Sequence, residues 1–391
     1  MLELPRQEVK AGGTPYAANA RRFLRPEDHP DGQAALPATE TETKRCIFTG
    51  DRIISARAVN ARRKERKMKI GIVGTGAMGC VYAALLGAAG NEVWAVDSWA
   101  AHVAAMAEHG LALEGASGSR TVRLNATTDP SAAGRCDLVI IATKAMDVAA
   151  AAEAARPMVK PDGMILTIQN GLGSAQKVAD VLGPARVVIG VVGGFGASIT
   201  APGKAHHNGM ELVRLGEMNG PVSERVESLA ELWRAAGFTV KCFDDMDQLV
   251  WEKLICNCAF SASAALTGCT VGEIIADPEA WSVASTCAVE AYMVARASNI
   301  RLDIDDPVNY VRDFGLKIPG ARPSMLLDHL AGRRSEIDAI NGAIPPAAAR
   351  VGVRAPVNET VSALVRAKEK QFGAPGAPGA SGASGASGAS E

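Results

Sequence analysis

The sequence predicts an α/β protein in which an N-terminal, doubly wound sheet domain is followed by an all-helical C-terminal domain. Three observations support this fold class. Between residues 68 and 240, short apolar runs alternate with helical segments, a pattern typical of parallel strands joined by helices. The first apolar run leads directly into a glycine-rich loop at 74–79. From about residue 241 to residue 372, long alanine-rich helical periodicity replaces the alternation.

The glycine-rich loop follows the predicted strand KIGIV and precedes a predicted helix at 81–89. In a G-x-G-x-x-G loop the first glycine permits the turn, the second admits a pyrophosphate, and the third lets the helix pack on the sheet. A glycine-rich turn without a ligand is the alternative, but strand, helix and a later acidic residue are all in place. We therefore predict a Rossmann-type dinucleotide-binding domain. Its expected cofactor contacts are Gly74, Thr75, Gly76, Ala77, Met78 and Gly79.

Asp97 ends the second predicted strand, at 92–96, about 20 residues beyond the glycines. A carboxylate at this point accepts a hydrogen bond from the adenosine ribose and repels a 2′-phosphate. Residues 98–100 are Ser, Trp and Ala, so no neighbouring cation is available to pair a 2′-phosphate. Asp97 thus favours NADH over NADPH.

Three further apolar runs, at 136–143, 163–169 and 186–192, predict buried parallel strands. Lys144 follows the first run, and Asn170 with its neighbouring glycines follows the second. Ligands of open α/β sheets bind beyond the carboxyl ends of the strands. Both residues are therefore candidates for a ligand site.

Composition limits the classes of partner. The 391 residues carry a formal net charge of −1 and a sequence pI near 6.6, which gives no broad electrostatic footprint for nucleic acid or an anionic membrane. No apolar run reaches the length of a membrane span. The eight cysteines are scattered, and Cys256-x-Cys258 has no second pair or nearby His to complete a metal site. We expect free thiols in a reducing cytoplasm, a small-molecule partner and no metal.

The two ends of the chain differ from the rest. Residues 1–67 lack sustained periodicity and predict a disordered extension, or a translation start assigned upstream of Met68. A short basic run at 62–67 fits a solvated charge cluster better than a nucleic-acid contact. Residues 373–391 repeat Gly-Ala-Pro and Gly-Ala-Ser, which predicts a flexible tail.

Two clusters in the helical segment contain polar residues whose role the pattern alone leaves open. Lys253 and Asn257 are four residues apart and so share one helix face. They could point into a cleft, or they could be an exposed pair on an amphipathic helix. Around Glu336, the isoleucines at 337, 340 and 344 predict the core stripe of a helix. Ser335 could cap that helix while Glu336 interacts with its positive end.

Residues 68–372 resemble the ketopantoate reductase (2-dehydropantoate 2-reductase) family. The matching blocks occur in order: GTGAMG at 74–79, ATKAMD at 142–147, QNGLG at 169–173, WEKLICN at 251–257, ALTGCTVGEI at 265–274, SM at 324–325 and SEIDAINGA at 335–343. The resemblance implies reduction of ketopantoate to pantoate by NAD(P)H, with NADPH usual, in pantothenate biosynthesis. It also suggests a homodimer.

The resemblance gives roles to individual residues. Lys253 falls on the position of the general acid, which would hold and protonate the carbonyl oxygen. The positions that hold substrate or order the site fall on Asn170, Asn257 and Ser324, and those that contact cofactor include Lys144 and Glu336. Glu336 is also expected to bind a substrate hydroxyl or to keep Lys253 protonated.

Two departures from the family pattern concern the substrate. Ser261-Ala262 stands where many members carry Asn-Pro, so Ser261 is a shorter candidate substrate contact. Arg322 precedes Ser324 and is either a carboxylate clamp or a surface residue. With Asp97, these departures resemble the branch of NAD-dependent D-2-hydroxyacid dehydrogenases of the D-mandelate type, which is the second hypothesis. A non-catalytic NAD(H) sensor is the third, although a sensor would not need Lys253.

Overall fold

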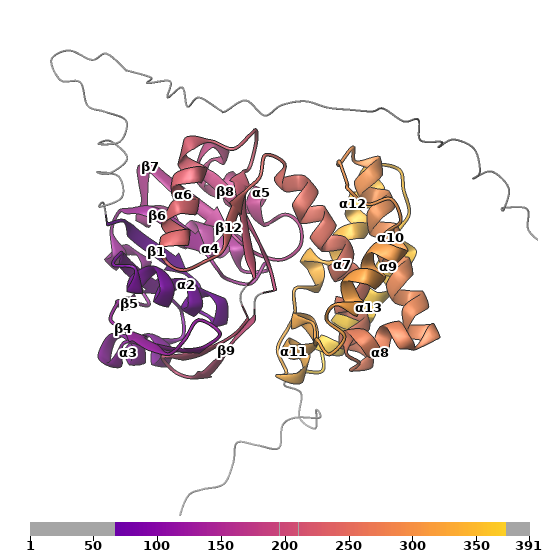
Figure 1. Cartoon of the computed structure of the whole chain (residues 1–391), viewed down its shortest axis with the longest axis horizontal. Coiled ribbons are helices and arrows are strands. Elements are labelled where there is room, and N and C mark those ends of the chain that lie inside the picture. Colours follow the sequence, from indigo (N-terminus) through magenta and orange to yellow (C-terminus); the bar gives the residue numbers. More distant parts are fainter. Residues whose placement is uncertain (1–66, 195, 210, 373–391) are drawn as a thin grey trace, which may run out of the picture. The chain divides into compact units, whose positions relative to one another are not determined.

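The computed structural model describes residues 67–194, 196–209 and 211–372. The predicted extension at 1–67 lies outside the described residues except for Lys67, and the predicted tail at 373–391 lies wholly outside them. Figure 1 shows the sheet domain in indigo to pink and the later helices in orange to yellow. The predicted fold class, a Rossmann-type α/β domain followed by a helical domain, is confirmed.

The main sheet has eight strands in the order β12-β11-β8-β7-β6-β1-β2-β5. The strands from β8 to β5 are parallel, whereas β11 runs antiparallel to β8 and β12 runs parallel to β11. From β1 the chain adds β2 and β5 on one side of the sheet and then crosses to add β6, β7 and β8 on the other side. The loop after β1 therefore lies at a topological switch point. The strands are β1 (Lys69–Val73), β2 (Glu92–Val96), β5 (Asn125–Thr127), β6 (Cys136–Ile141), β7 (Val159–Thr167), β8 (Val187–Gly193), β11 (Leu212–Glu217) and β12 (Val240–Cys242).

A second, four-stranded sheet was not predicted from the sequence. Its order is β4-β3-β10-β9, and helix α2 lies between it and the main sheet. The second sheet thus covers the helix that follows the glycine-rich loop. Its strands are β3 (Leu111–Gly115), β4 (Arg120–Val122), β9 (Gly196–Ala201) and β10 (Lys204–Gly209).

Four helices of the sheet domain connect strands of the main sheet, and α3 leads from β2 to β3 of the second sheet. Helix α2 begins at Ala77, four residues earlier than predicted, so half of the glycine-rich loop is already its first turn. The helices are α2 (Ala77–Ala88), α3 (Ala100–His109), α4 (Val148–Ala155), α5 (Ser174–Leu182) and α6 (Glu224–Ala235), with 3-10 turns at Pro130–Ala133, Arg156–Met158 and Pro184–Arg186.

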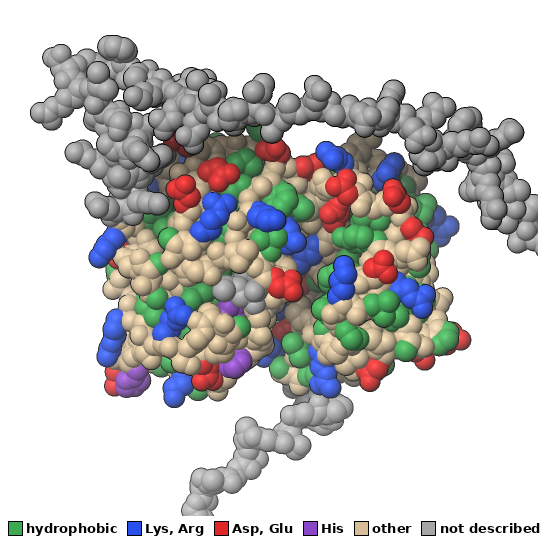
Figure 2. Space-filling view, viewed as in Figure 1, with side chains coloured by type: hydrophobic (Ala, Val, Ile, Leu, Met, Phe, Trp, Pro, Cys, Tyr) green, Lys and Arg blue, Asp and Glu red, His purple; other side chains and the backbone are tan. Residues whose placement is uncertain are grey.

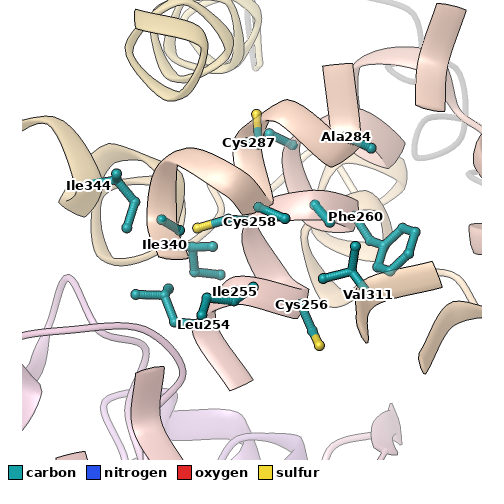
Figure 3. Close-up of a cluster of buried hydrophobic side chains, with 14 of the residues drawn as sticks. Leu254, Ile255, Cys256, Cys258, Phe260, Ala284, Cys287, Val311, Ile340 and Ile344 are labelled. Atoms are coloured by element: carbon teal, nitrogen blue, oxygen red, sulfur yellow. The ribbon is translucent and has the colours of Figure 1, made fainter. Parts of the chain in front are cut away.

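The helical domain is built around α7 (Met246–Thr267). Asp245 caps this helix through the backbone N–H of Gln248, and Gly268 ends it in the left-handed conformation. Small buried residues on α7 let α9 pack closely against it, and Figure 3 shows Cys258, Cys287 and Ala284 within this core. The other elements are α8 (Val271–Ala276), α9 (Pro278–Ala297), α10 (Pro307–Leu316), α11 (Ser324–Leu330), α12 (Ile344–Arg350) and α13 (Pro356–Glu369), with 3-10 turns η4 (Ile337–Ala339) and η5 (Asn341–Ala343).

Helix α7 is also the one described helix long and apolar enough to cross a membrane. Its most apolar stretch is 67% buried within the protein, as expected of a core helix. On the face shown in Figure 2, Lys and Arg side chains are interspersed with Asp and Glu. This face therefore presents both signs of charge.

The prediction of a helix around Glu336 was wrong. The segment forms the two 3-10 turns η4 and η5, separated by Ile340 at φ −103° and ψ −105°. The Ser335 hydroxyl donates to Glu369 Oε1 at 2.6 Å and does not cap a helix. The isoleucine stripe did identify buried residues, because Ile337, Ile340 and Ile344 are all core residues.

Candidate active site

The glycine-rich loop has the geometry that its spacing predicts. Gly74 has a φ of +90°, and its N–H donates to the Val96 carbonyl at 2.9 Å, which joins the loop to the end of β2. A Cβ on Gly79 would come within 2.1 Å of the Gly74 carbonyl oxygen, whereas one on Gly76 would meet nothing within 4 Å. Gly79 therefore allows close packing, and Gly76 leaves open space in front of the loop.

The loop also presents polar groups that have no protein partner. No side chain caps the first turn of α2, so its N–H groups face outward from the positive end of the helix. The Thr75 hydroxyl is fully buried and makes no hydrogen bond within the described residues. These features fit a pyrophosphate and its dinucleotide, which would be held at the N-terminus of α2.

A buried histidine that sequence reasoning missed supports the loop from below. His102 Nδ1 accepts the Gly203 N–H at 2.9 Å, so Nε2 carries the proton and donates to the Thr75 carbonyl at 3.1 Å. Cys80 donates its thiol proton to the same carbonyl at 3.0 Å. Burial lowers the pKa of His102, which keeps the ring neutral in this arrangement.

Asp97 lies half-buried at the end of β2, beside the glycine-rich loop. Its Oδ1 accepts the backbone N–H of Trp99 at 2.9 Å. The indole of Trp99 is 46% exposed and stacks on His102, with ring centroids 5.0 Å apart. Asp97 and the exposed indole thus stand together beside the loop, where the adenosine half of a dinucleotide would lie.

The loops after β6 and β7 meet the helical domain. Gln169 Nε2 donates to the carbonyls of Ile141 and Thr143 and so links the ends of the two strands. A Cβ on Gly171 would lie 2.1 Å from the Ala339 carbonyl oxygen, which accepts the Leu172 N–H at 2.8 Å. Only glycine permits this approach, so the block predicted at 169–173 is a contact between the domains.

Lys144 and Glu336 lie on opposite sides of the same contact. The Glu336 carboxylate accepts the Ala145 N–H at 2.9 Å and lies 3.9 Å from Lys144 Nζ. Lys144 Nζ is also 2.6 Å from Asp328, a buried carboxylate of α11 that sequence reasoning did not select. Arg333 pairs with the other oxygen of Asp328 at 3.0 Å. The two predicted cofactor contacts are therefore neighbours.

Lys253 extends from α7 to the end of β8, where its Nζ donates to the Val192 carbonyl at 2.5 Å. Burial lowers the pKa of Lys253 to about 8. The Arg214 cation lowers it further, while the Glu336 carboxylate opposes the shift. Lys253 is thus an ammonium that can lose its proton near neutral pH, in reach of residues from both domains.

The other predicted substrate residues lie on three different segments, and only those on α7 share a helix face with Lys253. Asn257 and Ser261 continue the face of Lys253 along α7, but Ser261 is only 4% exposed. Asn170 is half-buried in the loop after β7. Ser324 is exposed at the first position of α11, one helical turn before Asp328.

Arg322 belongs to the surface. Its side chain is exposed, and its charge acts on Glu273 of α8, whose pKa it helps to lower after the larger effect of hydrogen bonds from Thr270. Of the two readings of this residue, the structure favours the surface one.

No group of three or more potential ligands in the described residues is arranged to hold a metal ion. The seven described cysteines are all free thiols. Burial raises the pKa of Cys256 to about 12 and that of Cys258 well above its ordinary value. This pair consequently resembles core packing rather than a redox or metal motif.

Comparison with known proteins agrees with this geometry. The family described as ketopantoate reductase PanE/ApbA matches residues 70–220, and its C-terminal counterpart matches residues 245–369. A 2-dehydropantoate 2-reductase of Mesorhizobium japonicum is 32% identical over 76% of this chain and 97% of its own length. One from Archaeoglobus fulgidus is 30% identical over 78% of this chain and 99% of its own.

Two solved structures of different enzymes are similar to this chain. A PanE/ApbA family ketopantoate reductase from Ralstonia eutropha is 32% identical, with a TM-score of 0.72, and covers 78% of this chain and 99% of its own. A D-mandelate dehydrogenase, solved with NADH and anilino(oxo)acetate, is 26% identical, with the same TM-score and the same shares covered.

Proposed function

Because the chain belongs to the ketopantoate reductase PanE/ApbA family, we propose that it is a 2-dehydropantoate 2-reductase, an oxidoreductase that reduces ketopantoate to pantoate. Lys253 is the observation that carries the proposal. The ammonium of this half-buried lysine, whose pKa desolvation lowers to about 8 and whose charge Glu336 favours, is held at the end of β8 and has the properties of a general acid for a carbonyl oxygen.

The reaction needs a hydride for the carbonyl carbon and a proton for the carbonyl oxygen. A bound nicotinamide dinucleotide supplies the hydride. As negative charge develops on the oxygen, the Lys253 ammonium leaves the Val192 carbonyl, stabilises that charge and delivers its proton. Glu336 favours the charged form of Lys253, which keeps the proton available. Asn170, Asn257, Ser261 and Ser324 are proposed to hold the substrate.

The cofactor is a nicotinamide dinucleotide, and we propose that it is NADH. The family habit is NADPH, but Asp97 places a carboxylate at the end of β2 and the adjacent residues supply no cation. A D-mandelate dehydrogenase with the same TM-score as the ketopantoate reductase carries NADH. Glycine-loop residues 74–79, Lys144, Asn170 and Glu336 are proposed as the other cofactor contacts.

A second candidate is an NAD-dependent D-2-hydroxyacid dehydrogenase acting on bulky branched or aromatic 2-keto acids. Two observations favour it. Ser261 leaves more room than the usual Asn at that position, and Asp97 fits NADH. The third candidate, a non-catalytic NAD(H) sensor, would gain nothing from a lysine with a lowered pKa.

Two lesser assignments accompany the function. Seven free thiols support a reducing cytoplasm. Large apolar side chains exposed on the helical domain, among them Met293 and Leu364, support a homodimer formed by this domain. Sedimentation velocity of the purified protein tests the dimer, and a monomer at micromolar concentration would contradict it.

The test of the proposed substrate is a panel assay. Oxidation of NADH and of NADPH is followed with ketopantoate, with branched 2-keto acids and with aromatic 2-keto acids. The highest kcat/KM for ketopantoate with NADH is the expected result. A bulky 2-keto acid reduced better than ketopantoate would assign the protein to the dehydrogenase branch. Preference for NADPH would overturn the role of Asp97.

A further inference from the structure

Arg214 lies on strand β11, which pairs antiparallel with β8, the strand whose Val192 carbonyl accepts the hydrogen bond from Lys253. Its partner across the ladder is Val191 of β8. Directly opposed residues of two strands point to the same face of a sheet, as do residues two apart along one strand. Arg214, Val191 and Gly193 therefore share one face, and Val191 packs there against Met246 of α7.

The Arg214 side chain extends along this face toward the carboxyl end of β8. A Cβ built on Gly193 would lie 3.0 Å from Arg214 Nη1, so the guanidinium passes over the bare backbone of this glycine. The preceding residue, Val192, supplies the carbonyl that accepts the Lys253 proton. The Lys253 ammonium thus bonds to Val192, and the Arg214 guanidinium lies against the next residue, Gly193.

Arg214 has no carboxylate partner among the described residues, although it is only half-exposed. Its charge acts on the groups facing it: it lowers the pKa of Lys253 and opposes the rise that burial causes in the pKa of Tyr310. Lys253 has Glu336 as its counter-charge, whereas no carboxylate of the described residues forms an ion pair with Arg214. The guanidinium is therefore available to an anionic ligand.

The position of Arg214 separates it from the pyrophosphate of a dinucleotide. Strand β8 lies three strands away from β1, whose end carries the glycine-rich loop. At a spacing of about 4.8 Å between strands, that is roughly 14 Å. The anion that Arg214 attracts is accordingly one at the Lys253 end of the site.

We propose that Arg214 binds the carboxylate of the 2-keto acid substrate while Lys253 binds the adjacent keto oxygen. This inference rests on the proposed function and adds the group that selects a 2-keto acid over a simple ketone. The planar guanidinium of Arg214 suits bidentate contact with a carboxylate, whereas the compact ammonium of Lys253 suits the single keto oxygen. Gly193 contributes by leaving room for the guanidinium.

The test compares Arg214→Gln with the wild type on a 2-keto acid and on its methyl ester, which lacks the negative charge. For the acid, KM in the NADH assay and the dissociation constant from calorimetry with the NAD⁺-loaded enzyme, which cannot reduce the acid, should rise about 10- to 100-fold. For the ester, the two enzymes should agree within a factor of about two, and NADH affinity should be unchanged. Arg214→Lys should recover part of the acid binding.

Two further variants serve as controls. Lys241→Gln removes an exposed cation from β12 at the residue paired with Arg214, and should leave acid binding unchanged. Gly193→Ala should weaken acid binding in the wild type by displacing the guanidinium, and should add nothing in the Arg214→Gln background.

Equal losses for acid and ester, or no loss for either, would overturn the role of Arg214 while leaving the reductase intact. A wild-type enzyme that binds 2-keto acids but oxidises neither NADH nor NADPH with them would overturn the proposed function alone. A wild type that neither binds nor reduces any 2-keto acid would overturn both.

Discussion

The carboxylate of Glu336 accepts a hydrogen bond from the backbone N–H of Ala145 at 2.9 Å. This bond joins a 3-10 turn of the helical domain to the loop after β6. The same carboxylate favours the protonated form of Lys253. One side chain therefore contributes both to the contact between the domains and to the charge at the reacting oxygen.

The first prediction concerns pH. Lys253 must be protonated to act as the acid, so reduction should be present below its pKa of about 8 and lost as pH rises through that value. Glu336→Gln keeps an acceptor for Ala145 but removes the charge that raises this pKa. The alkaline limb of the kcat profile should therefore move to lower pH.

Asp328→Asn is the matched control, because Asp328 is an equally buried carboxylate whose partner is Lys144. It should leave the alkaline limb in place. An alkaline limb that does not move in Glu336→Gln would show that Glu336 does not act on Lys253.

The second prediction concerns the choice between NADH and NADPH. Asp97→Ser removes the charge that repels a 2′-phosphate and the acceptor for the ribose hydroxyl. KM for NADPH should fall and KM for NADH should rise, each by about tenfold, which corresponds to one charge-assisted hydrogen bond. The ratio of kcat/KM for the two cofactors measures this, and an unchanged ratio would remove Asp97 from the site.

The third prediction concerns His102. His102→Phe keeps a ring beneath Trp99 but loses the bonds to Gly203 and to the Thr75 carbonyl, so the glycine-rich loop loses its support. The NADH dissociation constant, from fluorescence titration, should rise about tenfold, and the melting temperature should fall.

His109→Phe changes an exposed histidine of the same helix and should alter neither quantity. Undisturbed NADH binding in His102→Phe would mean that the loop holds its shape without the imidazole.

Local signals in the sequence predicted the backbone geometry of the glycine-rich loop. The spacing of Gly74, Gly76 and Gly79 predicted the tight turn, the open space and the close packing that the structure shows, and Asp97 follows at the expected strand end. The same holds for α7, whose periodicity predicted that Lys253 and Asn257 share a face. Each of these features depends on residues that are close together in the sequence.

Other features depend on residues far apart in sequence. Asp328 meets Lys144 across 184 residues, and Arg214 meets Gly193 only through an antiparallel register. The strands of the second sheet, among them GASITA and KAHHNG, consist largely of small and polar residues, so no apolar run marks them in the sequence. Around Glu336, helical periodicity misled because the Ala339 carbonyl bonds to Leu172 instead of continuing a helix.

If Lys253 is the general acid, its removal should stop reduction without releasing the cofactor. NADH oxidation with ketopantoate and with the best bulky 2-keto acid is compared for the wild type, Lys253→Ala and Lys253→Met, with NADH affinity measured in parallel. Both variants should lose about 10²- to 10⁴-fold in kcat while NADH affinity is retained. Wild-type turnover in either variant would contradict this role of Lys253.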